Sequence, residues 1–172
     1  FDAHSLSVDP QLTDPDGDDG VLGFSGEAVG LPQIVDDGDA AFSAAGTWNA
    51  SSSSGYQDGY RSSGAGSGAD VASWTFTDLV PGAWYDVAAT WPTPTGTRST
   101  NAPYSLYDGA LLVARPRVNQ QSAPSDFSEG GVAWTNLGRI HLTGGTLVVT
   151  LSDLANNTVL ADAVRFTPLR RW

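Results

Sequence analysis

Short alternations of apolar and polar residues are the clearest pattern in the chain. Ala72, Trp74 and Phe76 are apolar, whereas the residues between them are Ser or Thr. This two-residue period is typical of a strand with one buried face. Further strands are predicted at residues 84–91, 104–107, 111–118, 134–142, 146–152 and 159–167. Because the sequence contains no convincing amphipathic helix, the pattern predicts an all-β protein of seven or eight short strands.

Turn-forming residues separate the predicted strands. Asp108-Gly109 predicts a hairpin turn, because both residues tolerate a positive φ at the centre of a tight turn. Thr143-Gly144-Gly145 joins two further strands, and Pro116 places its segment at a sheet edge or a bulge. The Ser/Gly-rich residues 51–68 are predicted to form a long loop. We therefore expect an antiparallel, jelly-roll-like β-sandwich.

Residues 1–33 differ from the rest of the chain, because Asp, Gly and Pro dominate and the apolar residues follow no period. We expect an extended arm or linker there, a sandwich domain over 34–168 and a short tail over 169–172. Asp2-Ala3-His4-Ser5-Leu6 and Asp14-Pro15-Asp16-Gly17 resemble the tail of secreted parallel β-helix proteins. The chain opens on Phe1 without an initiator Met or a signal peptide, which suggests a piece of a longer precursor.

Charge and composition exclude several classes of function. The formal net charge is −11 and all eight basic residues are Arg, so nucleic acid is not an expected partner. Without Lys the chain has no Schiff-base chemistry, and without Cys it has neither disulfides nor a thiolate metal site. No apolar run approaches the length of a membrane span. The acidic, Lys-free composition is typical of extracellular bacterial proteins, and we expect an extracellular or cell-surface location.

A series of short motifs runs in order through residues 34–166. They are Ile34–Asp39, Phe42-Ser43, Gly46-Thr47-Trp48, Gly55-Tyr56, Ala72–Phe76, Leu79–Gly82, Ala89–Pro92, Thr100–Tyr104, Val118–Gln121, Leu137-Gly138 and Ala161–Arg165. In these motifs the chain resembles the Golvesin/xanthan-lyase carbohydrate-binding-like domain, a β-sandwich module of large secreted bacterial proteins. The resemblance implies a sandwich fold and a module without catalytic activity. It specifies the fold better than the function, because one fold serves many functions.

Asp162 is the most informative single residue. In the predicted strand 159–167 it shares a face with apolar residues, so its carboxylate would be buried. A buried carboxylate must accept hydrogen bonds, pair with an Arg or bind a cation. Several carbohydrate-binding sandwiches hold a structural calcium between their first and last strands, and Asp36, Asp37 and Asp39 lie beside the first strand here. These four residues form a candidate calcium site, with hydrogen-bonded carboxylates as the alternative.

A second acidic cluster lies in the N-terminal arm. Asp14, Asp16 and Asp18 have the spacing of the first three ligands of an EF-hand loop. A complete EF-hand is excluded, because Asp19 stands where that loop requires Gly and Ser25 stands where it requires Glu. An irregular calcium loop and a solvated acidic turn both remain open.

The candidate glycan site combines aromatic and polar residues of the loops. Trp91 in a Pro-rich loop and Tyr56 in a Gly/Ser loop are the best candidates for stacking against a sugar ring. Tyr104 is a further aromatic candidate, and Arg98 and Asn101 could hydrogen-bond a glycan. Two alternatives stay open: most aromatic residues of a sandwich lie in its core, and an Asn two residues before a proline often stabilises a turn.

Catalysis finds little support in the sequence. The chain has two His and only two Glu residues, and no pair of Asp residues stands out for glycoside hydrolysis. We expect a non-catalytic module that attaches a larger secreted protein to polysaccharide or to a cell-surface glycan. The alternative is a structural subunit of an extracellular fibre or surface assembly, whose N-terminal arm packs on the neighbouring subunit.

Overall fold

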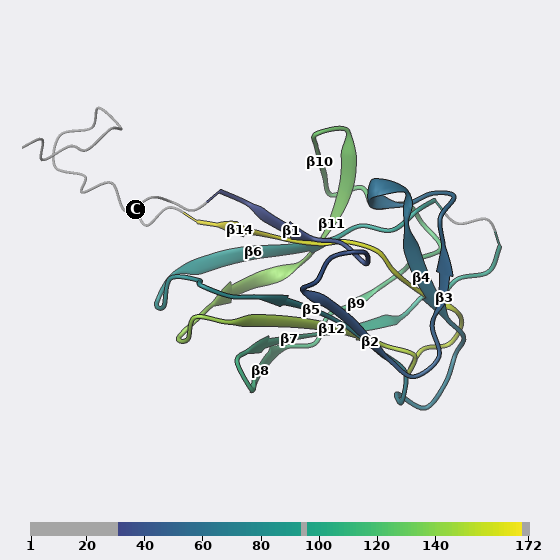
Figure 1. The fold of residues 1–172 in the computed structure, drawn as a ribbon, viewed down its shortest axis with the longest axis horizontal. Coiled ribbons are helices and arrows are strands. Elements are labelled where there is room, and N and C mark those ends of the chain that lie inside the picture. The colour runs from purple at the N-terminus through teal and green to yellow at the C-terminus, as the bar shows by residue number, and fades with distance from the viewer. Residues whose placement is uncertain (1–30, 94–95, 170–172) are drawn as a thin grey trace, which may run out of the picture. The chain divides into compact units, whose positions relative to one another are not determined.

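Two β-sheets pack face to face in the computed structural model, which describes residues 31–93 and 96–169 (Figure 1). The first sheet has five strands, in the order β1 (Gln33–Val35), β14 (Val164–Pro168), β6 (Trp84–Ala89), β11 (Val132–His141) and β10 (Phe127–Glu129). The second has six strands, in the order β2 (Phe42–Ala45), β5 (Val71–Phe76), β12 (Leu147–Ser152), β7 (Ala102–Asp108) and β8 (Leu111–Ala114), with β9 (Arg117–Val118) also paired with β7.

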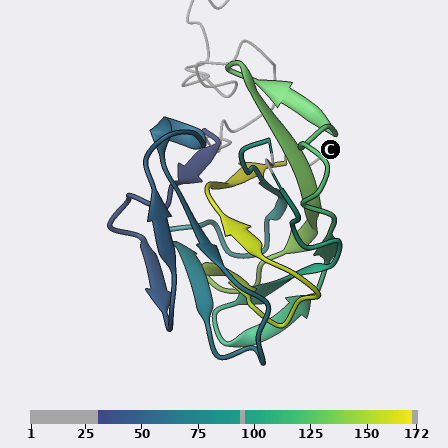
Figure 2. The same cartoon turned by 90° about the vertical axis from the view of Figure 1, so that its right-hand side faces the viewer.

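A smaller third sheet lies at one end of the two main sheets. Its strands are β13 (Val159–Ala161), β4 (Tyr60–Ser63) and β3 (Asn49–Ser51), and a short 3-10 turn, η2 (Tyr56–Asp58), connects β3 to β4. Figure 2 looks onto this end and shows the yellow C-terminal segment next to the blue strands, in agreement with the pairing of β13 with β4. All strand pairs are antiparallel, so the predicted all-β antiparallel sandwich is confirmed.

The core lies between the two main sheets because every second residue of the central strands is apolar. In β5, Ala72, Trp74 and Phe76 are buried, as their alternation with Ser and Thr predicted. Trp74 lies at the centre of the core, with its ring stacked on that of Tyr104 at 6.2 Å between centroids. Its indole N–H donates a hydrogen bond to the backbone carbonyl of Asp162 at 2.9 Å. The core therefore directly supports the segment that carries Asp162.

The last predicted strand, 159–167, is two strands in two sheets. β13 pairs with β4 in the small sheet, whereas β14 pairs with β1 and β6 in the five-stranded sheet. The chain changes sheets at Asp162-Ala163, and both sides of the change are fully buried. The sequence pattern does not show the break, because residues 159–161 and 163–164 are all apolar.

Two further local predictions differ from the structure. The Ser/Gly-rich stretch 51–68 is not a loop throughout, since it contains η2 and β4. The central residues of the β7–β8 turn are Gly109 and Ala110, because Asp108 pairs with Leu111. Asp108 is instead the last residue of β7, and its buried carboxylate accepts hydrogen bonds from the Thr143 N–H, the Thr143 hydroxyl and the Gly144 N–H. It therefore ties the β11–β12 turn to β7.

Replacing Asp108 with asparagine is expected to lower the free energy of unfolding by about 2 kcal/mol, the scale of hydrogen bonds to a charged group. The hydrogen bonds from Thr143 hold the pKa of Asp108 below the ordinary value of 3.8. The stabilisation by ionised Asp108 is thus fully present above about pH 3.8, and it is lost as the pH falls through the lower pKa of the folded state. Urea unfolding at pH 7 and at pH 3 should show a deficit of the variant at pH 7 that shrinks at pH 3. An equal deficit at both pH values would contradict this account.

The described boundaries bear on the remaining domain predictions. Gln33 is already in β1 and pairs with Phe166, so the sandwich begins at residue 33. Residues 1–30 and 170–172, and with them most of the predicted arm and tail, lie outside the described residues. In the part of the chain that the structure describes, no helix is long and apolar enough to cross a membrane.

Candidate calcium and glycan sites

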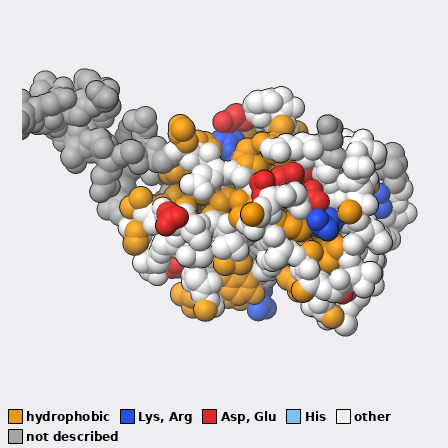
Figure 3. Space-filling model, viewed as in Figure 1, with side chains coloured by type: hydrophobic (Ala, Val, Ile, Leu, Met, Phe, Trp, Pro, Cys, Tyr) orange, Lys and Arg blue, Asp and Glu red, His pale blue; other side chains and the backbone are white. Residues whose placement is uncertain are grey.

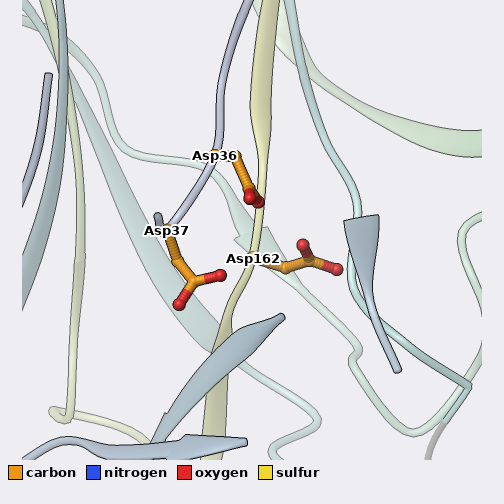
Figure 4. A group of neighbouring side chains, drawn as sticks. All are labelled: Asp36, Asp37 and Asp162. Atoms are coloured by element: carbon orange, nitrogen blue, oxygen red, sulfur yellow. The ribbon is translucent and has the colours of Figure 1, made fainter. Parts of the chain in front are cut away.

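Three carboxylates come together where β1 ends and the C-terminal chain changes sheets. Asp36 and Asp37 directly follow β1, and Asp162 lies between β13 and β14 (Figure 4). All three residues are buried, and one carboxylate oxygen from each lies within 4.8 Å of the others. Figure 3 shows acidic side chains gathered beside a basic one on the face of the domain seen there. The group contains three of the four residues predicted as a calcium site near the first and last strands, and the pairing of β1 with β14 brings them together.

The charge of this acidic trio, Asp36, Asp37 and Asp162, is only partly compensated. Arg61 of β4 lies with its Nε 3.3 Å from Asp37 Oδ2, as an ion pair. The Tyr56 N–H donates to both oxygens of Asp162, at 3.0 and 3.2 Å. One guanidinium thus faces three carboxylates, and burial adds to the cost of keeping all three ionised.

Burial, together with this surplus of negative charge, raises the pKa values of the trio. Burial is the largest cause of the raised pKa of Asp36 and of Asp37. Burial raises the pKa of Asp162 to about 8, although the hydrogen bonds from the Tyr56 N–H oppose the rise, and the charges of Asp36 and Asp37 add to it. Without a cation, the trio therefore retains a proton near neutral pH.

The residues of the trio fit a calcium ion. Calcium binds six to eight hard oxygens, and three carboxylates supply several of them. Asp36 Oδ1 is buried and makes no hydrogen bond with the described residues, which leaves it available as a ligand. Gly55 and Gly59 border the trio so closely that a Cβ would lie 3.2 Å from Asp162 Oδ2 and 3.0 Å from Asp37 Oδ1. Glycine at both positions therefore lets the loop around η2 pack closely against the carboxylates.

The other predicted metal ligands do not join the trio. Asp39 is exposed, and its Oδ2 accepts a hydrogen bond from the Asp36 N–H at 2.8 Å. Asp39 therefore stabilises the turn after β1. Of the two roles predicted for it, calcium ligand or hydrogen-bonded carboxylate, the structure shows the second. Asp14, Asp16 and Asp18 lie outside the described residues, so the calcium loop predicted for the arm stays a prediction.

An open pocket of about 440 Å³ adjoins the trio, since Asp162 is one of its lining residues. Its apolar wall is formed by side chains from four separate segments of the chain. The apolar and aromatic lining residues are Tyr56, Trp91, Pro92, Ala123, Pro124, Val132 and Ala133, and the hydroxyl-bearing ones are Ser54, Thr90 and Thr93. This loop pocket presents an aromatic ring, hydroxyls and one carboxyl, a combination that suits a sugar ring.

Tyr56 and Trp91, the two best aromatic candidates, both line the loop pocket. Tyr56 is half-buried and its ring lies 6.0 Å from that of Trp134, between centroids. Trp91 is only 4% exposed and its indole N–H donates to the Ser122 carbonyl, so it builds the wall and offers little of its ring face. Tyr56 is thus the residue of this pair that a bound sugar can reach.

The remaining three predicted glycan residues do not line the loop pocket. Tyr104 is 1% exposed and stacks on Trp74, so its prediction as a glycan contact is wrong and it is a core residue. The Asn101 side chain accepts hydrogen bonds from the Ser99 hydroxyl and the Asn156 N–H, as a turn-stabilising amide does. Arg98 is half-buried in the same loop, and its backbone carbonyl accepts a bond from Gln121.

Sequence reasoning missed most residues of the loop pocket and the cation beside the trio, and Arg61 and Val132 show why. Arg61, the partner of Asp37, lies in a stretch that its Ser and Gly content marks as a loop. Val132 reaches the loop pocket from the start of β11, next to Gly131. The Gly130-Gly131 pair could have marked the β10–β11 hairpin, but nothing in the sequence shows that this hairpin lies beside Tyr56.

Comparisons with known proteins agree with this architecture. A xanthan lyase of Paenibacillus contains a similar structure, with a TM-score of 0.65 and 27% sequence identity over 81% of this chain. A β-(1,4)-mannanase of Podospora anserina, whose solved structure spans a GH26 and a CBM35 part, matches 83% of this chain with a TM-score of 0.53 and 13% identity. The second likeness shows a shared fold alone.

The match covers only a small part of these larger proteins. It spans 13% of the xanthan lyase chain and 28% of the mannanase chain. A search of the curated proteins finds no match to this chain. The family comparison identifies residues 33–168 with the Golvesin C-terminal domain, in agreement with β1 beginning at Gln33 and β14 ending at Pro168. The chain therefore belongs to the Golvesin C-terminal domain family.

Proposed function

We propose that this domain is a non-catalytic carbohydrate-binding module of a larger extracellular protein, and that a glycan binds in the loop pocket. The observation that carries the proposal is the lining of that pocket, which combines the half-buried Tyr56 with the hydroxyls of Ser54, Thr90 and Thr93. Aromatic rings bind the apolar face of a sugar, while hydroxyls and a carboxyl orient it by hydrogen bonds. The similar structure with 27% identity comes from an enzyme named for a polysaccharide, xanthan, which supports a glycan as ligand.

The pocket lining favours binding over hydrolysis. Glycoside hydrolysis requires two carboxyl groups on opposite sides of the scissile bond. Among the described residues that line the loop pocket, Asp162 is the only carboxylate. Its oxygens are held by the Tyr56 N–H, and its neighbours Asp36 and Asp37 lie in the trio. Asp162 therefore serves to position the pocket wall.

We further propose that the acidic trio binds a structural calcium ion. The trio connects three segments distant in sequence, namely the end of β1, the loop at η2 and the β13–β14 connection. A cation there would neutralise the surplus charge and fix Asp162, which in turn holds the backbone of Tyr56. Calcium would thus organise the glycan pocket without contacting the glycan.

Replacing Tyr56 with alanine is expected to weaken glycan binding about tenfold or more, since a central aromatic contact dominates such sites. Affinity electrophoresis through gels that contain single polysaccharides, xanthan among them, measures the loss. Phe127, which is also half-buried but does not line the pocket, supplies the matched control variant Phe127→Ala. Equal retention of wild type and Tyr56→Ala on every polysaccharide would contradict the loop pocket as the binding site.

The alternative function, a subunit of an extracellular fibre, depends on the N-terminal arm. Residues 1–30 lie outside the described residues, and no contact among the described residues favours that assembly. Packing of the arm on a neighbouring subunit therefore stays a prediction from the sequence. Light scattering on the full chain and on residues 32–172 distinguishes the two functions, because only the fibre requires the arm for association.

A further inference from the structure

The outer face of the six-stranded sheet carries no charge over its central strands. Nine half-buried side chains of β5, β12 and β7 point away from the core: Val71, Ser73, Thr75, Val148, Thr150, Ser152, Pro103, Ser105 and Tyr107. None of them is charged, in a chain with a net charge of −11. The outer face of the five-stranded sheet differs, because it carries the ion pairs Asp86–Arg139 and Glu129–Arg165.

The strand register arranges these side chains in two rows that cross the strands. The first row consists of four hydroxyls, one from each of four neighbouring strands: Ser43, Ser73, Thr150 and Ser105. The second row lies beside it and contains Thr75, Val148, Tyr107 and Leu112. Neighbouring strands are about 4.8 Å apart, so each row repeats at close to the length of one pyranose unit. A hydroxyl row next to an apolar and aromatic row is thus displayed at a sugar-like spacing.

The same face is hollowed into a groove. Its volume is about 460 Å³, and its lining includes the outward residues Ser105, Tyr107, Val148 and Thr150. Gly68 borders it on one side, and the β7–β8 turn at Gly109-Ala110 borders it on the other. These borders lie at opposite ends of the strands, because Val71 pairs with Ser152 at one end and Asp108 pairs with Leu147 at the other, so a ligand that crosses the strands passes between them.

We propose that this sheet face binds a neutral, extended polysaccharide that lies across the strands. The ring of Tyr107 packs against the apolar face of one sugar, and the hydroxyl row exchanges hydrogen bonds with sugar hydroxyls. None of the nine outward positions offers a cation to an acidic polymer, and Arg117 borders this face only at its edge, opposite Pro103. The inference rests on the proposed carbohydrate-binding function, but it assigns a second surface, separate from the loop pocket and from the acidic trio.

The test uses the full chain and two variants on the outer face, Tyr107→Ala and Thr150→Glu. Both side chains are half-buried and outward, so circular dichroism should show an unchanged fold. The probes are hydroxyethylcellulose and glucomannan as neutral polymers and polygalacturonate as an acidic one, each at several concentrations in affinity gels. We expect each variant to lose about tenfold in affinity for a neutral polymer, whereas Ser128→Ala on β10 loses none.

The variants of the two surfaces distinguish the two proposals. If Tyr107→Ala weakens binding of a neutral polymer and Tyr56→Ala does not, the sheet face is the site for that polymer. If both variants weaken it, the two surfaces bind the same chain. If only Tyr56→Ala weakens binding, or only polygalacturonate is retained by the wild type, the sheet-face proposal is overturned and the loop pocket stands. If no probe is retained by any protein, both proposals fail for these polymers.

Discussion

Replacing Trp74 with alanine is expected to destabilise the domain by about 3–5 kcal/mol, the usual cost of removing a large aromatic residue from a packed core. Trp74 is fully buried, its ring stacks on Tyr104, and Phe42 packs against it edge to face at 5.4 Å between centroids. The variant also leaves the Asp162 carbonyl without its indole donor. Because a small domain is stable by roughly 5–15 kcal/mol, this single change should bring it close to unfolding.

The variant Trp74→Phe separates packing from the hydrogen bond. Phenylalanine keeps most of the aromatic volume but cannot donate, so we expect a loss of about half that of Trp74→Ala. Urea unfolding followed by Trp fluorescence and by circular dichroism gives both values. A Trp74→Ala variant with nearly wild-type stability would show that this core repacks around the missing ring, contrary to the central place of Trp74 in the sandwich.

Calcium is expected to raise the stability of the domain by about 2.7 kcal/mol at a concentration one hundred times its Kd. Asp36→Asn and Asp162→Asn should abolish this gain, because each removes a carboxylate of the trio. Asp78→Asn is the matched control, since Asp78 is exposed and lies outside the trio. Thermal melts with excess calcium and with chelator measure the gain. A melting temperature that is the same in calcium and in chelator would contradict the proposed ion.

The pH dependence in chelator provides a second measurement on the same residues. The pKa of Asp162 is about 8 in the folded domain and near its ordinary value of 3.8 in the unfolded chain. Between these pH values the folded state holds a proton that the unfolded state has released. Stability should therefore fall as the pH rises from about 4 to about 8, by at most roughly 1.4 kcal/mol per pH unit from this residue. Asp162→Asn should remove this slope.

The parts of the fold that follow a single period could be predicted from the sequence. The alternation around Trp74 fixes both the strand and its buried face, and it needs no knowledge of the neighbouring strands. Asp162 was identified as a buried carboxylate from the period of one strand over 159–167, although the structure breaks that strand at Asp162 and buries the residues on both sides of it. Its grouping with Asp36 and Asp37 followed from the likeness to carbohydrate-binding sandwiches that hold a calcium between their first and last strands, and β1 and β14 are paired here.

Features that depend on contacts distant in sequence could not be predicted. Tyr104 and Tyr107 lie on opposite faces of β7. Only the packing of the sheet shows that Tyr104 faces the core and Tyr107 faces outward. Gln120 is completely buried, where its side chain bonds both the N–H and the carbonyl of Leu160. A polar side chain that replaces a strand partner in this way leaves no periodic signal.

The pairing of β1 with β14 has a mechanical consequence. These strands are antiparallel, with Gln33 opposite Phe166 and Val35 opposite Val164, so the domain is entered and left at the same end. A force that pulls Gln33 away from Pro168 would peel this ladder open one pair at a time, which is the weak direction for a sheet. Beyond the third pair the opening would reach Asp36, Asp37 and Asp162. An ion bound there would resist further separation of β1 from β14. The force needed to open the domain would then depend on the calcium concentration around it.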